Sequence, residues 1–204
     1  MADQSPKNGP DIPSQAHLRD ALSQIAREIE NQPLRSSSLA RIVREAFGGS
    51  DAAGAWNWRM AYDMMQAAAV MQVLQCGDPD AITSAKMIAK RLLTETRRSE
   101  QQIRLQQFST PLAYAALATR AAALSPGETF LEPSAGTGAL AGFVVLAGGK
   151  PMLNEIDPFR RALLAAVFDT EVTGFDAEHI DDLLTVPRCA SGTPRAPRRR
   201  DRPL

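Results

Sequence analysis

Over the first hundred residues, apolar side chains recur at three- and four-residue spacing, which is the pattern of amphipathic helices. The first predicted helix follows Ser14, a good N-cap residue, and Pro33 ends it. A second, shorter helix follows the serines at 36–38 and closes at Gly48. Residues 1–14 are polar and proline-rich, so we expect them to be disordered.

Two further helices are predicted in this part of the chain. One runs from Trp56 to Gln75, and its methionines stand at helical spacing, which indicates core filler on one face. The other opens at Asp78-Pro79, a cap followed by proline at the first helical position, and continues to Leu92. We therefore expect a helical bundle over residues 15–106.

The segment Trp56-Asn57-Trp58-Arg59 has two interpretations. An aromatic pair beside a cation could stack on nucleic-acid bases, or it could pack in the protein core. Residues two apart on a helix do not share a face, so at most one of the two tryptophans would belong to the core. We favour packing.

The hydrophobic period changes at Thr129. A short strand there runs into the turn Glu132-Pro133-Ser134-Ala135-Gly136-Thr137-Gly138, and an apolar helix follows over 139–147. Glycines in such a turn let the backbone bend tightly and approach a ligand closely. A second strand at 151–156, a helix from Pro158 and a third strand at 171–173 continue the alternation. The sequence therefore predicts an α/β fold in which 107–187 form part of a Rossmann-like sheet.

An acidic residue follows or ends each predicted strand: Glu132, Glu155 and Asp176. Ligands of open α/β sheets bind beyond the carboxyl ends of the strands, so we expect these three side chains to converge on one crevice. Glu155 comes about 20 residues after the glycine turn, where an acid that binds ribose hydroxyls is expected.

Two departures from the dinucleotide fingerprint argue against an NAD or ATP site. The turn lacks the third glycine of G-x-G-x-x-G, and the chain has no G-x-x-x-x-G-K-[ST] phosphate loop. S-adenosylmethionine has a ribose and an adenine but no phosphates, so it needs the close turn and the acid without an anion cradle. The alternative is that Gly136-Thr137-Gly138 is only a tight turn from strand to helix.

Four segments in order resemble those of DNA adenine methyltransferases: QFSTP at 107–111, LEPSAGTG at 131–138, NEIDP at 154–158 and FDA at 175–177. Within that family the chain is similar to the methylase portion of strawberry-notch-type methylase and helicase proteins of bacterial mobile elements. GAWNWRMAYD from Gly54 and TRRSEQQIRLQQFSTP from Thr96 also look like that group. The resemblance covers roughly 54–184. It implies a class I methyltransferase fold, S-adenosylmethionine as cofactor, DNA as substrate and a helicase portion in the intact protein.

The resemblance also implies a role for individual residues. Thr110 and Pro111 match the segment that closes over the methionine end of the cofactor, and Asp176 matches the acid that bonds the adenine amino group. Glu155 would bind the ribose hydroxyls. The complete set of predicted cofactor contacts is Thr110, Pro111, Glu132, Pro133, Ala135, Gly136, Gly138, Glu155, Asp176 and Ala177.

The motif that holds the target base is missing. In the family, an Asn or Asp followed by Pro-Pro and an aromatic residue captures the flipped adenine, and this chain has no Pro-Pro pair. We therefore assign no catalytic residue and expect the chain to be truncated before that motif. Residues 188–204 are rich in Arg and Pro. A change of reading frame is the origin we favour, while a basic nucleic-acid arm or a solvated, disordered end are the alternatives.

Composition adds a few exclusions. The 23 Lys and Arg residues balance 23 Asp and Glu residues, which argues against a wholly basic nucleic-acid coat protein. The arginines at 97, 98 and 104 could contact DNA phosphates or form a solvated helix face. Cys76 and Cys189 have no C-x-x-C spacing, and the two histidines, His17 and His179, are isolated, so we expect no metal site.

The amino-terminal residues do not match a secretory signal, and the most apolar run is too short for a membrane span, so we expect a cytoplasmic protein with reduced thiols. Two functions compete with a DNA adenine methyltransferase. The chain could be a non-catalytic helical module that binds DNA or a partner and keeps a degenerate methyltransferase remnant. It could also be a methyltransferase that has the same cofactor site but acts on RNA or protein.

Overall fold

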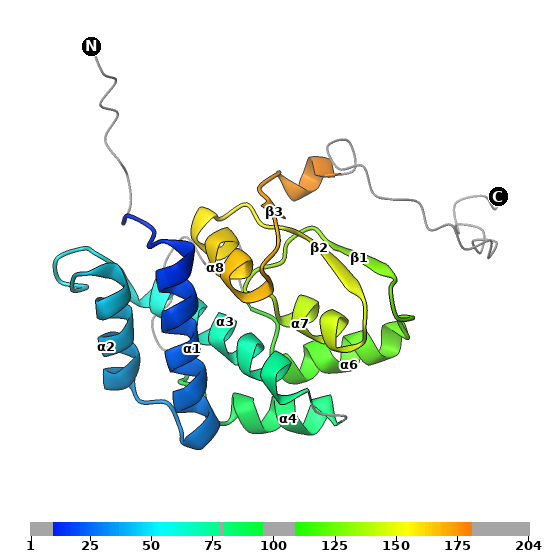
Figure 1. The fold of residues 1–204 in the computed structure, drawn as a ribbon, viewed down its shortest axis with the longest axis horizontal. Coiled ribbons are helices and arrows are strands. Elements are labelled where there is room, and N and C mark those ends of the chain that lie inside the picture. Colours follow the sequence, from blue (N-terminus) through cyan, green and yellow to red (C-terminus); the bar gives the residue numbers. More distant parts are fainter. Residues whose placement is uncertain (1–9, 78–79, 96–108, 181–204) are drawn as a thin grey trace, which may run out of the picture.

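The computed structural model describes residues 10–77, 80–95 and 109–180. Four features of the sequence lie outside these ranges: the Asp78-Pro79 helix start, the arginines at 97–104, Gln107-Phe108 and the 188–204 tail. Within the described residues, a helical first half leads into a three-stranded parallel sheet (Figure 1). The predicted α/β class is confirmed.

The first two helices begin and end where local signals place them. Helix α1 spans Gln15–Asn31, and the Ser14 hydroxyl caps it by accepting the backbone N–H of His17 at 3.3 Å. Helix α2 spans Ser36–Phe47 and ends at Gly48, whose φ of 65° is left-handed. Glycine adopts that conformation without steric cost, so the predicted stop is confirmed.

Helix α3 spans Trp58–Cys76 and begins two residues later than predicted, because Asn57 is its cap and accepts the N–H of Met60 at 3.0 Å. Trp56 therefore precedes the helix. Its ring is buried, its indole N–H donates to the Gly49 carbonyl at 3.0 Å, and its centroid lies 5.7 Å from that of Trp58. The favoured core packing is confirmed for Trp56, and the helix-face argument does not apply to the pair.

The prediction that α3 buries a single methionine face is wrong. Buried residues occur all around this helix, since α1, α2, α4, α7 and α8 all pack against it. They are Met60, Ala61, Tyr62, Asp63, Met64, Met65, Ala67, Ala68, Ala69, Val70, Met71, Gln72 and Val73. A helix that is buried on all sides is the centre of a core rather than its surface layer.

Helix α4 spans Ala81–Ala89 and is shorter than predicted. Its cap is Asp80, whose carboxylate accepts the N–H of Thr83 at 3.3 Å, and Leu92 lies beyond its end. Helix α6, Leu112–Ala122, then precedes the first strand. No helix among the described residues is long and apolar enough to cross a membrane.

The sheet has the order β1-β2-β3, with β1 at Thr129–Glu132, β2 at Lys150–Asn154 and β3 at Val172–Thr173. All neighbours are parallel. Helix α7, Ala139–Leu146, connects β1 to β2, and helix α8, Pro158–Phe168, connects β2 to β3. Leu153 packs with Ala141 of α7 and Leu164 of α8, so both helices cover the same face of the sheet.

The other sides of α7 and α8 face the helical first half (Figure 1). Phe143 of α7 and Leu163 of α8 belong to the same hydrophobic cluster as the buried side chains of α1 and α3. The predicted helical bundle and the α/β region therefore share one core. Their predicted boundary near residue 106 lies outside the described residues.

Candidate functional site

The glycine turn after β1 is held close to the end of β2. The N–H of Ala135 donates to the Asn154 carbonyl at 2.9 Å, and Gly136 and Gly138 have φ angles of 58° and 88°. A Cβ at Gly138 would lie 2.7 Å from Cε2 of Phe168, so this position needs glycine for packing as well as for its φ. A Cβ at Gly136 would meet no atom within 4 Å, which leaves space beside the backbone for a ligand.

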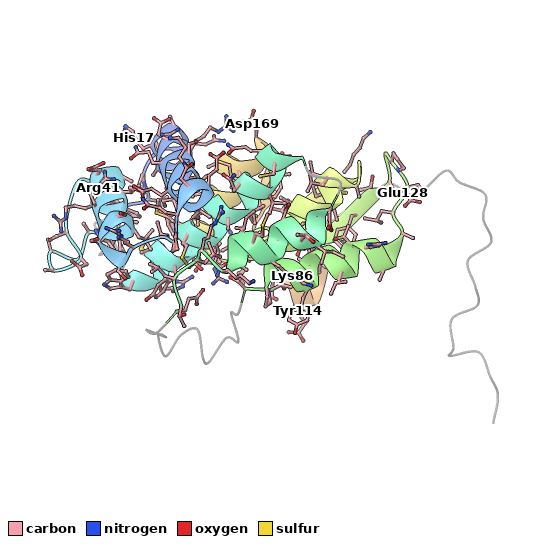
Figure 2. The ribbon with its side chains drawn as sticks, turned by 90° about the horizontal axis from the view of Figure 1, so that it is seen from below. His17, Arg41, Lys86, Tyr114, Glu128 and Asp169 are labelled. Atoms are coloured by element: carbon pink, nitrogen blue, oxygen red, sulfur yellow. The ribbon has the colours of Figure 1, made fainter. Side chains whose placement is uncertain are left out.

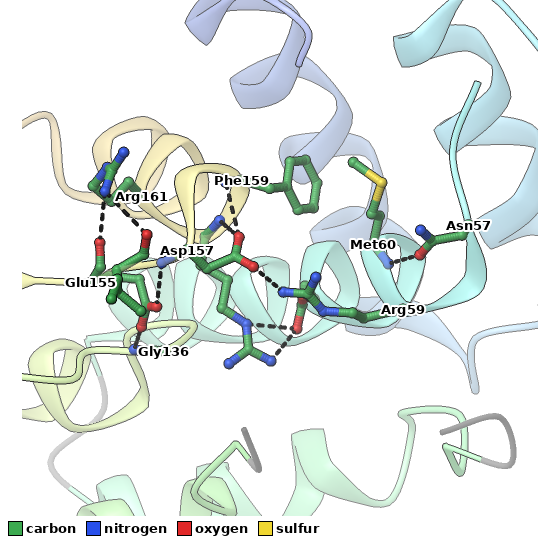
Figure 3. Close-up of polar contacts among 11 residues, drawn as sticks. Asn57, Arg59, Met60, Gly136, Glu155, Asp157, Phe159 and Arg161 are labelled. Atoms are coloured by element: carbon green, nitrogen blue, oxygen red, sulfur yellow. Dashed lines mark hydrogen bonds and ion pairs between the residues drawn. The ribbon is translucent and has the colours of Figure 1, made fainter. Parts of the chain in front are cut away.

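Glu155 joins this turn to the start of α8. Its side chain is only 4% exposed. Oε2 accepts the N–H of Gly136 at 2.8 Å, and Oε1 accepts the N–H of Asp157 at 2.9 Å (Figure 3). A carboxylate oxygen has two lone pairs, so each of these oxygens can accept one further hydrogen bond. The glycine turn and Glu155, which the sequence analysis assigned to one binding site, are therefore in direct contact.

Glu132, at the end of β1, is 7% exposed, and its Oε2 accepts no hydrogen bond from the described residues. Burial raises the pKa of this carboxyl to about 7; the backbone N–H of Ala141 in the first turn of α7 lowers it, and the charge of Glu155 raises it further. At neutral pH both the protonated and the charged form of this carboxyl are therefore populated. The protonated form of this carboxyl can donate a hydrogen bond, and the charged form can pair with a cation.

Sequence reasoning missed Asn154, the residue just before Glu155. Its side chain is fully buried, and its Nδ2 donates to the carbonyls of Pro133 and Phe175, both at 2.9 Å. Its Oδ1 accepts from the Thr173 hydroxyl and the Phe175 N–H, both at 2.8 Å. Asn154 thereby fixes the segments that follow β1 and β3 to the end of β2. The available signal was an amide at the end of an apolar strand.

The predicted residues on the flanking segments lie at the surface. Asp176 is exposed and caps the short 3-10 helix η1, Ala177–His179, by accepting the N–H of Glu178 at 3.1 Å. Thr110 is exposed, and Pro111 is the N-cap residue of α6. The neighbouring Ser109 hydroxyl accepts from that of Thr137 at 3.4 Å. This contact brings the start of α6 to the glycine turn.

Ile156 is a second residue that the sequence analysis missed. It lies between Glu155 and Asp157, and 55% of it is exposed, although it is a large apolar side chain. An exposed isoleucine beside a buried acid offers an apolar surface for a flat ring. The signal in the sequence was the apolar residue within the NEIDP segment.

A buried ion-pair network between α3 and the start of α8 lies next to Glu155. Arg59 of α3 forms an ion pair with Asp157, which also caps α8 by accepting the N–H groups of Phe159 and Arg160 at 2.9 and 3.1 Å (Figure 3). Arg160 in turn donates to Asp63 of α3 at 2.8 Å. The cation of Arg59 is thus engaged inside the protein, which contradicts its use as a stacking group for bases.

For both Asp63 and Asp157, burial raises the pKa and the neighbouring arginines lower it. Burial raises the pKa of Asp63 and outweighs the opposing effect of the Arg160 and Arg59 charges. For Asp157, burial is again the largest effect, but the hydrogen bond from Arg59 and the backbone N–H of Arg160 together lower the pKa. Asp157 is therefore held as the charged partner of Arg59.

A cavity of about 530 Å³ lies away from Glu155, between α4, α6 and α7 at the end of α7 opposite the glycine turn, and Thr119, Phe143 and Leu146 contribute to its lining. Within the described ranges, no group of three His, Cys, Asp or Glu side chains could hold a metal ion.

No protein-family model, no curated protein and no solved structure matches this chain. The geometry of Glu155 and the glycine turn therefore provides the basis for a proposed function.

Proposed function

We propose that this chain carries the S-adenosylmethionine-binding part of a Rossmann-like class I methyltransferase that acts on the amino group of adenine in DNA. The observation that carries the proposal is the position of Glu155. It is buried at the end of the central strand and hydrogen-bonded to Gly136, and it still has acceptor capacity on both oxygens. The two hydroxyls of a ribose would each donate a hydrogen bond to one of these oxygens.

The residues around Glu155 fit the adenosine part of the cofactor. Ile156 would provide an apolar surface for the adenine ring, and the exposed carboxylate of Asp176 would accept hydrogen bonds from the adenine amino group. The open space beside Gly136 would let the ligand approach the backbone. Asn154 would keep these groups at a fixed spacing, because it binds the segments that follow β1 and β3.

The residues near the glycine turn fit the methionine part. Glu132 has a buried oxygen without a partner among the described residues, and the α-ammonium group of the ligand would supply one. Thr110 and Pro111 would close over this end, since Ser109 contacts Thr137 of the turn. When bound, the cofactor supplies an electrophilic methyl group on its sulfonium. These residues bind and orient it, and we assign none of them to base capture.

The DNA substrate and a helicase portion as partner are part of the same proposal, as is a cytoplasmic location, where such a substrate would be met. We further propose that the chain alone transfers no methyl group. Robust methyl incorporation into adenine-containing DNA by this chain would contradict that part of the proposal.

A second candidate function is a non-catalytic helical module that binds a partner. The observation that favours it is the outer face of α6, where Tyr114 is 67% exposed and projects from the surface (Figure 2). Leu117, one turn further along the helix, is 46% exposed, and contiguous apolar patches at a surface mark interaction sites. This function requires no cofactor.

Calorimetric titration with S-adenosylmethionine separates the two candidates. We expect saturable binding that Glu155→Ala abolishes, because the substitution removes both ribose acceptors. Glu171→Ala, which removes an exposed acid just before β3, is the matched control and should leave the affinity unchanged. An absence of binding heat and of thermal stabilisation would refute the cofactor site, and full affinity in Glu155→Ala would show that the ribose assignment is wrong.

A further inference from the structure

Charged side chains connect the helical first half to the turn that carries Glu155. Four charged side chains alternate in sign along a buried path: Asp157 at the N-cap of α8, Arg59 and Asp63 of α3, and Arg160 of α8. Each is less than a fifth exposed, and their formal charges cancel. The α3 members and the members at the start of α8 are nearly a hundred residues apart in sequence, so this contact exists only in the folded chain.

The path ends on the turn that carries Glu155. Arg59 holds the side chain of Asp157, and the backbone N–H of Asp157 donates to Glu155 Oε1 at 2.9 Å. The other oxygen of Glu155 accepts from Gly136 at 2.8 Å. A displacement of Asp157 would therefore move the Glu155 carboxylate relative to the glycine turn. In Figure 3, Arg59, Asp157, Glu155 and Gly136 lie in one continuous row of contacts.

We propose that Arg59 is a positioning residue for Glu155: by holding Asp157, it fixes the Glu155 carboxylate against Gly136. Arg59 does not contact the ligand itself. Its planar guanidinium can face two carboxylates at once, with Nη2 on Asp157 and Nε 3.6 Å from Asp63. A lysine at this position keeps the charge but offers a single ammonium point, so it cannot hold both groups in the same geometry.

The first test needs no ligand. Since Glu155 accepts the N–H of Gly136, hydrogen exchange at the Gly136 amide reports the position of this carboxylate. We expect Arg59→Lys to accelerate that exchange about tenfold, as for an amide whose local opening becomes easier. Asp157→Asn should act in the same direction, because Asn still caps α8 while the ion pair is lost. This second variant keeps the test decisive if Arg59→Lys folds poorly.

Met64→Ala is the matched control. It opens a cavity at a fully buried position of α3 outside the ion-pair network and thus destabilises the same helix. Exchange at Gly136 should stay unchanged in this variant, because a turn amide exchanges through local opening rather than global unfolding. Unchanged Gly136 exchange in both Arg59→Lys and Asp157→Asn would overturn the positioning role, and so would equal acceleration in Met64→Ala.

The second test addresses affinity and rests on the proposed function. We expect Arg59→Lys to weaken binding of S-adenosylhomocysteine about tenfold, within the range for coupled members of one network. Its 2′-deoxyadenosyl analogue lacks one of the hydroxyls that would donate a hydrogen bond to Glu155. Arg59→Lys should therefore weaken binding of this analogue less than about threefold. If Arg59→Lys weakens the binding of both ligands equally, Arg59 does not act through Glu155. If the unsubstituted chain binds neither ligand, the proposed function fails, and the Gly136 exchange still decides the positioning role.

Discussion

The buried carboxyl of Glu132 makes a contribution to the stability of this protein that is lost as the pH rises. In the unfolded chain this group loses its proton near its ordinary pKa of 4.5, whereas in the fold burial keeps the proton bound up to about pH 7. Between these values the folded state binds more protons than the unfolded state, so the free energy of unfolding decreases with increasing pH. The contribution of Glu132 to the free energy of unfolding is fully lost above about pH 8.

Glu132→Gln removes this titration while keeping the shape of the side chain. Each unit of pKa difference corresponds to about 1.4 kcal/mol, so the full penalty of charging Glu132 in the fold is about 3 kcal/mol. We expect the variant to gain stability over the unsubstituted protein as the pH rises, by about 2–3 kcal/mol between pH 5 and pH 8. At pH 4 both side chains are neutral in the fold, so the two proteins should differ least there.

Urea unfolding at pH 4, 5, 6, 7 and 8 measures the effect, with equal m-values as the check that both proteins expose the same surface. Glu171→Gln changes an exposed acid and serves as the control, with a difference that stays within about 0.5 kcal/mol at every pH. If the stability of Glu132→Gln runs parallel to that of the unsubstituted protein from pH 5 to pH 8, the raised pKa of Glu132 is refuted.

Three further results are expected. Asp63→Ala leaves Arg160 buried without its main counter-charge, so it should lower the free energy of unfolding by about 3–5 kcal/mol in urea; a loss below 1 kcal/mol, on the order of an exposed pair, would contradict the network. Gly138→Ala should cost about 1–3 kcal/mol more than Gly136→Ala, since only the Gly138 methyl would strike α8, and equal costs would rule out that contact. If the proposed function holds, cofactor binding at pH 6.5 should release a fraction of a proton from Glu132, measured as a binding heat that depends on the buffer; a heat independent of the buffer would separate Glu132 from the ligand.

The elements that local signals control were predictable from the sequence. Ser14 and Gly48 mark the ends of helices through a hydrogen bond or a left-handed φ angle of their own, which needs no tertiary contact. The strand, glycine turn and helix after Thr129 followed from the change of period in the same way. These signals depend on residues within a few positions of one another.

What the sequence did not yield depends on distant contacts. The burial of α3 on all sides before its last turn results from five other helices packing around it. The run of apolar residues at 67–71 is typical of such a helix, but which elements cover it depends on distant contacts. The Arg59 ion pair with Asp157 joins residues 98 positions apart, so the charged residue within an aromatic segment gave no indication of its partner. Asn154 was overlooked because its importance lies in four hydrogen bonds to other segments.

The shared core limits how this protein can be divided. Phe143 and Leu163 are covered by the helical first half, so a piece that starts after residue 95 would present α7 and α8 to water as a large apolar surface. Such a surface favours aggregation rather than an independent fold. The helices of the first half are therefore a structural requirement for the α/β region, and transplanting the glycine turn and its acids to another scaffold would also require a substitute for α1 and α3.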